Sequence, residues 1–189
     1  MGAKLLALIA VIVLALALAG CATQAEPPRI ALLAPFEGRN RESGYNALYA
    51  ARLALSESGA NVELFPIDDG GLPATAVDRI HALANDPLTQ VVILLGENAT
   101  SADAQHALAD LPAIIIGTTS ATSAHSFVYS SEIQPDADFT ARYLASDQFA
   151  PTPNNLAMPI YNAIKIAADA AQTRNRTDSY QYLQANLSD

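Results

Sequence analysis

Short runs of aliphatic and β-branched residues recur along the chain and predict the strands of one sheet. Five such runs occur, at residues 30–34, 62–67, 91–95, 114–116 and 127–129. Three of them are apolar at every position, which is typical of strands buried on both faces of a parallel sheet. The segments between the runs are long enough for the crossovers that parallel strands require. The pattern therefore predicts an α/β fold.

Apolar residues at helical spacing occupy most of the segments between these runs. The predicted helices cover about 43–58, 73–84, 101–111, 135–144, 156–171 and 180–187. One further, weak helix is expected between the fourth and fifth strands. Because right-handed crossovers distribute helices over both faces of a sheet, we predict a three-layer, doubly wound, mostly parallel sheet.

The N-terminus carries an uninterrupted apolar run over residues 5–19, which follows Lys4 and ends just before Cys21. A short basic region, an apolar region too short to span a membrane comfortably and small residues before a cleavage point mark a secretory signal peptide. The Leu-Ala-Gly-Cys sequence that ends at Cys21 also resembles the lipobox of bacterial lipoproteins. This resemblance implies that residues 1–20 are removed and that Cys21 carries a diacylglycerol and an N-acyl chain. The alternatives are an uncleaved N-terminal helix and a secreted protein with a chance cysteine.

The mature chain is expected to be one domain on a lipid anchor. Residues 21–28 contain two prolines and no apolar period, which predicts a tether ahead of a single domain at 29–189. Several acyl chains hold a protein at a bilayer, so we expect a membrane anchor on the extracytoplasmic, periplasmic side. No cysteine follows Cys21, and the domain therefore has to be stable without an intramolecular disulfide.

Charge and motifs narrow the possible functions. The formal net charge is −9 and the ten basic residues are scattered, which argues against a nucleic-acid partner. His81, His106 and His125 match no metal-ligand spacing, so no metal is expected. The acidic segment 68–71 could gather carboxylates, but an ordinary turn into a helix at Pro73 is favoured. The sequence lacks the usual nucleophile, nucleotide-binding and zinc-protease motifs, so we expect neither an enzyme nor a cofactor.

Hydroxyl-rich segments follow two of the predicted strands, at 96–101 after the third and at 117–123 after the fourth. The carboxyl ends of parallel strands meet at one edge of the sheet, where ligands of open α/β folds bind. Hydroxyl groups both donate and accept hydrogen bonds, and helix N-termini at this edge favour anions. A small carboxylate would therefore fit. The alternative is that these residues form only helix caps and turns.

Six segments, taken in order, carry a resemblance to a known family. They are residues 29–38 with the helix at 44–55, then 62–73, 91–101, 116–122, 127–145 and 159–163. Their colinear order resembles the type 1 periplasmic binding proteins of the leucine/isoleucine/valine-binding group, the solute receptors of branched-chain amino-acid ABC importers. In that family, hydroxyl-bearing loops of the first lobe hold the α-carboxylate and α-ammonium of the ligand.

On the matching positions, the resemblance implies that five residues contact a small solute. They are Thr100, Ser101, Ser120, Ala121 through its backbone, and Thr122. Glu97 stands where the family often has proline. The first-lobe pattern ends near Phe149, and the late helix follows almost at once, so the second lobe of the family is expected to be absent. A cavity left open on one side binds a small solute weakly.

The leading hypothesis is therefore a lipid-anchored, single-lobe relative of amino-acid receptors, with an amino acid or a similar carboxylate as solute and an ABC permease as partner. A second hypothesis is an envelope interaction protein similar to the lipoprotein activators of penicillin-binding proteins, which also carry a domain of this fold. An uncovered apolar or Tyr-rich rim would then hold a protein partner or a second copy in a homodimer. A third is a truncated receptor without function.

Overall fold

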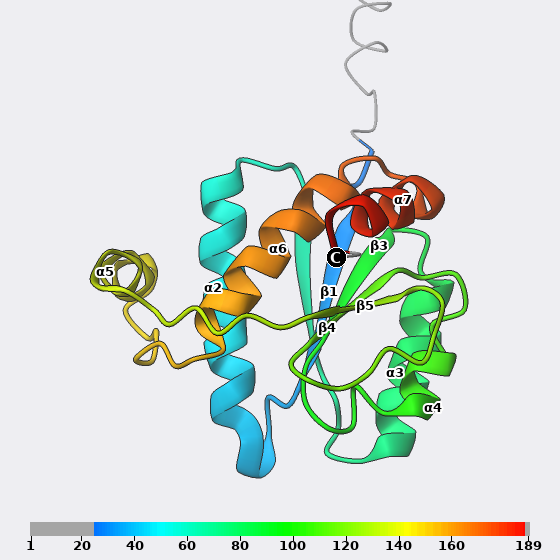
Figure 1. Ribbon diagram of the computed structural model, residues 1–189, viewed down its shortest axis with the longest axis horizontal. Coiled ribbons are helices and arrows are strands. Elements are labelled where there is room, and N and C mark those ends of the chain that lie inside the picture. The colour runs from blue at the N-terminus through cyan, green and yellow to red at the C-terminus, as the bar shows by residue number, and fades with distance from the viewer. Residues whose placement is uncertain (1–24, 188–189) are drawn as a thin grey trace, which may run out of the picture.

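The computed structural model describes residues 25–187, which form a parallel sheet between two layers of helices (Figure 1). The five strands found in this range are β1 (Arg29–Ala34), β2 (Glu63–Asp68), β3 (Thr89–Leu94), β4 (Ala113–Ile116) and β5 (Ser126–Tyr129). Their order across the sheet is β2-β1-β3-β4-β5, and every neighbouring pair is parallel. The predicted strands and the predicted fold class are confirmed.

The helices of this range occupy the segments predicted for them, with two corrections given below. They are η1 (Gly38–Asn40), α2 (Arg41–Ser58), α3 (Pro73–Asn85), α4 (Ala102–His106), α5 (Ala137–Ser146), α6 (Ala157–Ala171) and α7 (Arg176–Leu187). The expected signal peptide at 1–20 and the expected lipidation site, Cys21, lie outside the described residues. At the end of the expected tether, the Pro28 carbonyl accepts a hydrogen bond from the Glu63 amide at 2.9 Å.

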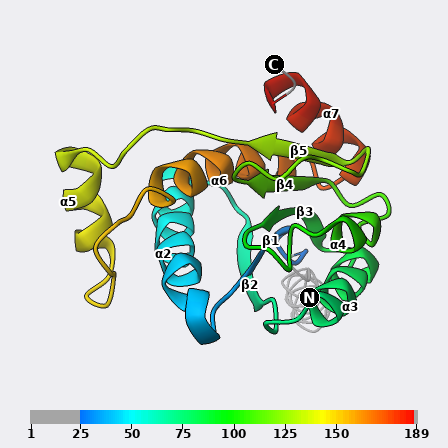
Figure 2. The same ribbon diagram turned by 60° about the horizontal axis from the view of Figure 1, so that its bottom comes forward.

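Alternation along β1 divides the core into two layers. Ile30, Leu32 and Ala34 are buried on one face of the sheet in the cluster that includes α2, α6 and Leu183 of α7. Ala31 and Leu33 point to the other face, where they pack with α3 and α4. Successive side chains of a strand point to opposite faces, so a strand covered by helices on both sides has to be apolar throughout. Figure 2 shows the two helical layers.

Two segments differ from the helices predicted for them. The link between β4 and β5 is a loop over residues 117–125, and the weak helix expected there is wrong. Helix α4 has five residues and ends at His106, whereas the apolar period predicted a helix as far as Leu111. Ala109 has a positive φ of 53°, and Pro112 disfavours helical geometry at the residue before it. Leu108 and Leu111 are still buried, because turns deliver them to the same core.

Helix α5 packs against α2 and lies outside the main helical layer (Figures 1 and 2). Its buried Phe139 meets the ring of Tyr161 on α6, with ring centroids 5.4 Å apart. Arg142 pairs with Glu57 of α2 at 2.6 Å. The pKa of the Glu57 carboxyl is lowered, first by the hydrogen bond from the Tyr161 hydroxyl and then by Arg142. Aromatic packing and one ion pair thus fix α5 to α2 and α6.

Gly44 sets how closely α2 approaches the end of β1. A Cβ atom added at this position would lie 2.2 Å from the backbone oxygen of Pro35, which is far inside van der Waals contact. Glycine in a helix interior normally costs stability relative to alanine. Here the absence of a side chain lets the first turns of α2 lie directly against the loop that leaves β1. That loop forms one wall of the cavity described next.

Candidate functional site

A cavity of about 720 Å³ opens at the carboxyl ends of β1, β3 and β4. Figure 2 turns this edge of the sheet toward the viewer. In the sheet, β2 lies on one side of β1 and β3 lies on the other side. The strand order therefore reverses between β1 and β3, and the cavity lies at this point. Such a point is where open α/β sheets bind their ligands. The volume falls within the range of small-molecule sites, roughly 300–1,000 Å³.

The cavity has an apolar interior and a polar rim. Buried or half-buried apolar side chains from three strand ends and from the start of α6 form its interior: Pro35, Leu95, Ile116 and Leu156. The rim is made of polar residues from η1, the first turn of α2 and the loops after β3 and β4: Asn40, Ser43, Glu97, Thr100, Ser101, Thr119, Ser120 and Thr122. Most of these rim residues are exposed or half-buried, so the cavity is open to solvent. A ligand here would keep part of its surface in water.

Gly96 forms the sharp turn from β3 into this rim. Its φ of +93° is a conformation that other residues rarely adopt. A Cβ atom there would also lie 3.2 Å from Cδ of Pro35, on the opposite wall. Glycine therefore allows the β3 loop to turn back toward the loop that follows β1.

The hydroxyls of the β3 loop are partly used inside the protein. The Thr100 hydroxyl donates to the carbonyl of Gly96 at 2.9 Å, and its oxygen lies 3.4 Å from the hydroxyl oxygen of Thr119. The Ser101 hydroxyl donates to the carbonyl of Asn98 and accepts from the Ala104 amide as the N-cap of α4. Both oxygens keep acceptor capacity for a ligand, since a hydroxyl oxygen has two lone pairs.

Gln105 joins the two hydroxyl-bearing loops. Its side chain is fully buried, and Nε2 donates to the carbonyls of Thr100 at 2.9 Å and Ser120 at 3.1 Å. Its Oε1 accepts a hydrogen bond from the Thr122 amide at 2.7 Å. One amide group therefore bonds to the loops after β3 and β4 and fixes the distance between them.

The structure brings four of the five expected contact residues to one cavity. Thr100, Ser101, Ser120 and Thr122 line it, whereas Ala121 is exposed in the same loop and does not line the cavity. The sequence reasoning did not single out Gln105. The sequence carries little signal for it, because position 105 lies outside the apolar stripe of the predicted helix, which is formed by Ala104, Ala107, Leu108 and Leu111.

The acidic segment after β2 forms a turn. Asp68 accepts hydrogen bonds from the amides of Phe36, Glu37 and Gly70, and Asp69 accepts one from Gly71. These carboxylates thus fix the loops beside the cavity, as the favoured turn interpretation expected. Within residues 25–187, no group of three or more His, Cys, Asp or Glu side chains is placed to hold a metal ion.

Solved structures share this fold at low sequence identity. A substrate-binding protein of an ABC transporter from Desulfitobacterium hafniense, in complex with Leu, is 12% identical, with a TM-score of 0.65 and coverage of 84% of this chain and 88% of that one. A branched-chain amino acid transporter substrate-binding protein from Streptococcus pneumoniae, in complex with isoleucine, is 11% identical, with a TM-score of 0.63 and coverage of 83% of this chain and 87% of that one. A possible leucine/isoleucine/valine-binding protein from Rhodopirellula baltica is 11% identical, with a TM-score of 0.57 and coverage of 87% of this chain and 88% of that one.

Comparison by sequence adds nothing to this similarity. No protein-family model and no curated protein sequence matches the chain. Among the helices of residues 25–187, none has the length and apolar character needed to cross a bilayer. The expected resemblance is confirmed at the level of the fold: the chain has the α/β fold of the type 1 periplasmic substrate-binding proteins of ABC transporters, with leucine/isoleucine/valine-binding proteins among its structural neighbours.

Proposed function

We propose that this protein is an extracytoplasmic solute receptor, anchored through a lipid on Cys21, that binds an amino acid at the cavity of the β1, β3 and β4 ends. One observation supports this most strongly. The hydroxyl-bearing loops after β3 and β4, which are separate in sequence, line a single cavity at the point where the strand order reverses. The structural neighbours are substrate-binding proteins, two of them in complex with leucine or isoleucine. We propose binding without catalysis.

The rim offers both kinds of polar contact that an amino acid requires. The oxygens of Thr100 and Ser101 accept from an ammonium group, since their own protons bond to backbone carbonyls. The hydroxyls of Ser120 and Thr122, which line the rim, donate to a carboxylate. Pro35, Leu95 and Ile116 cover the aliphatic part of the solute. Because the cavity is open, we expect weak affinity, and a permease or a second copy would cover the exposed side of the solute.

Ser120→Ala tests the site. Ser120 is exposed on the rim of the cavity, so its loss removes a ligand contact with little effect on folding. We expect the dissociation constant of the bound amino acid to rise about threefold to tenfold, the effect of one hydrogen bond. Isothermal titration calorimetry of the full chain in detergent micelles measures it. Ser56→Ala, on the exposed side of α2, is the matched control and should leave the affinity unchanged. Equal affinity in all three proteins would contradict the site.

Cys21→Ser tests the anchor. Without the thiol, no thioether to diacylglycerol forms, and the protein is expected to leave the membrane fraction and to lose incorporation of labelled palmitate. Fractionation of cells expressing both forms measures the two effects. If the variant stays in the membrane fraction at the wild-type level, the proposed lipid anchor is wrong.

The second hypothesis, an envelope interaction protein, has one observation in its favour. A second cavity of about 420 Å³ lies over the first half of α2 and is lined by Arg41, Tyr45, Tyr49 and Phe149, among others. Phe149 is 73% exposed and Tyr45 is 43% exposed, so an aromatic surface is available to a partner. In-cell crosslinking and light scattering distinguish this function from solute binding. A monomer that captures no envelope protein would contradict it.

A further inference from the structure

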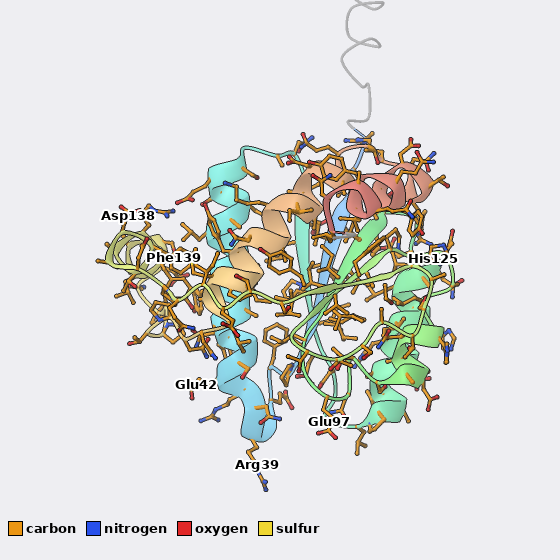
Figure 3. The ribbon with its side chains drawn as sticks, viewed as in Figure 1. Arg39, Glu42, Glu97, His125, Asp138 and Phe139 are labelled. Atoms are coloured by element: carbon orange, nitrogen blue, oxygen red, sulfur yellow. The ribbon has the colours of Figure 1, made fainter. Side chains whose placement is uncertain are left out.

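The cavity at the strand ends contains a single charged side chain. Fifteen residues line it, and among them only Glu97 is ionisable at neutral pH. Glu97 is exposed and lies at the edge of the sheet where the cavity opens (Figure 3). None of the salt bridges formed among residues 25–187 involves Glu97. Arg39 and Arg41 flank the lining residue Asn40 but do not line the cavity themselves. The one charge among the lining residues is therefore negative.

Hydrogen bonds inside the protein also affect which ligands the cavity favours. The protons of the Thr100 and Ser101 hydroxyls bond to the carbonyls of Gly96 and Asn98. On the β3 side, the cavity therefore presents hydroxyl oxygens as acceptors beside the Glu97 carboxylate. Acceptors without a compensating cation favour a ligand rich in N–H donors. The apolar interior, with Leu95, Ile116 and Leu156, suits an aliphatic stem.

We infer that the site selects amino acids with a cationic side chain, of the lysine and arginine type, and that Glu97 determines this specificity. The inference rests on the proposed solute-binding function. The α-carboxylate and α-ammonium bind to the hydroxyl-bearing loops, the aliphatic stem crosses the apolar interior, and the cationic end group pairs with Glu97 at the rim. The net charge of −9 for the whole chain also attracts cationic solutes over anionic ones.

Three solutes and two variants test this inference by calorimetry on the full chain at fixed ionic strength. L-Arginine, L-citrulline and L-leucine are the solutes, because citrulline has nearly the shape of arginine without its charge. Arginine is expected to bind about twofold to fivefold more tightly than citrulline, the effect of one exposed ion pair. Glu97→Gln should remove this difference by lowering arginine affinity to the level of citrulline. Asp178→Asn, on α7 at the opposite end of the sheet, removes the same charge and should keep the difference.

Each other outcome has a separate meaning. If leucine or citrulline binds as tightly as arginine to the unmodified chain, the proposed role of Glu97 in specificity is overturned. The proposed solute binding stands in that case. If Glu97→Gln and Asp178→Asn reduce arginine binding equally, the effect comes from net charge alone, and the assignment of Glu97 is also overturned. If none of the three solutes binds at millimolar concentration, the inference fails together with amino-acid binding.

Discussion

Replacement of Arg176 by methionine is expected to lower the free energy of unfolding by about 3 kcal/mol. The Arg176 guanidinium donates to the carbonyls of Ala84 and Asp86, both at 2.8 Å, of Thr89 at 3.0 Å and of Leu83 at 3.3 Å. Its side chain is only 16% exposed. Methionine keeps the aliphatic volume but removes all four of these hydrogen bonds, and losing the partners of buried acceptors is costly. The carbonyls of Leu83 and Asp86 each keep one backbone donor, the amides of Asp86 and Thr89.

The position of these carbonyls explains why the effect is large. Leu83 and Ala84 belong to the last turn of α3, whose carbonyls lack the usual helical partners four residues later and whose dipole favours a positive charge. The Leu83 carbonyl also accepts from the amide of Asp86, at 3.1 Å. Thr89 begins β3, so one side chain of α7 bonds to both α3 and the sheet. The ion pair of Arg176 with Asp110, at 3.0 Å, adds little because Asp110 is exposed.

Urea denaturation followed by circular dichroism measures the loss for Arg176→Met. Arg79→Met is the matched control, since Arg79 is exposed on the surface of α3 and its loss should cost less than about 0.5 kcal/mol. Lysine at position 176 should recover little, because one ammonium group cannot reach carbonyls spread around a planar guanidinium. Equal effects at positions 176 and 79 would show that the contacts of Arg176 contribute nothing.

Gln105→Met is the second substitution with a large expected effect, and it changes the candidate site. The substitution leaves the carbonyls of Thr100 and Ser120 and the amide of Thr122 without their shared partner. We expect a loss of about 2 kcal/mol in the free energy of unfolding, because these groups face a buried position. The two hydroxyl-bearing loops then separate, and amino-acid affinity should fall about tenfold or more.

Hydrogen exchange distinguishes loosened loops from a general loss of stability. In Gln105→Met, the Thr122 amide should exchange much faster than in the unmodified chain. The exchange rate of the β1 amides should rise only by the amount that the loss of global stability accounts for. Gln181→Met, exposed on α7, is the control for the change of side chain and should alter neither exchange nor affinity. Unchanged exchange at Thr122 would contradict the role of Gln105.

The strands could be predicted from the sequence because a sheet buried on both faces needs continuous apolar runs. Runs such as Val91–Leu95 carry that signal without help from tertiary context. The helix expected between β4 and β5 was wrong because residues 117–125 have the composition of a loop, with Gly117 at a φ of +120°. The early end of α4 was missed because Leu108 and Leu111 remain buried without helical geometry, and apolar spacing alone does not distinguish the two cases.

The candidate site was predicted in part for a similar reason. Residues that follow parallel strands have to meet at one edge of the sheet, which brings Thr100, Ser101, Ser120 and Thr122 to the same cavity. The contribution of Leu156 was missed because it comes from the start of α6, far away in sequence. The bonds of Gln105 depend on three backbone groups whose positions only the folded chain defines.

Chemical-shift mapping of the full chain in micelles tests the central claim most directly. During titration with L-arginine or L-leucine, the amides of residues 96–101 and 117–122 are expected to shift together, in a saturable manner. Helix α7, at the opposite end of the sheet, should not change. Shifts confined to the surface around Tyr45 and Phe149, or no saturable shift at millimolar amino acid, would contradict solute binding at the ends of β3 and β4.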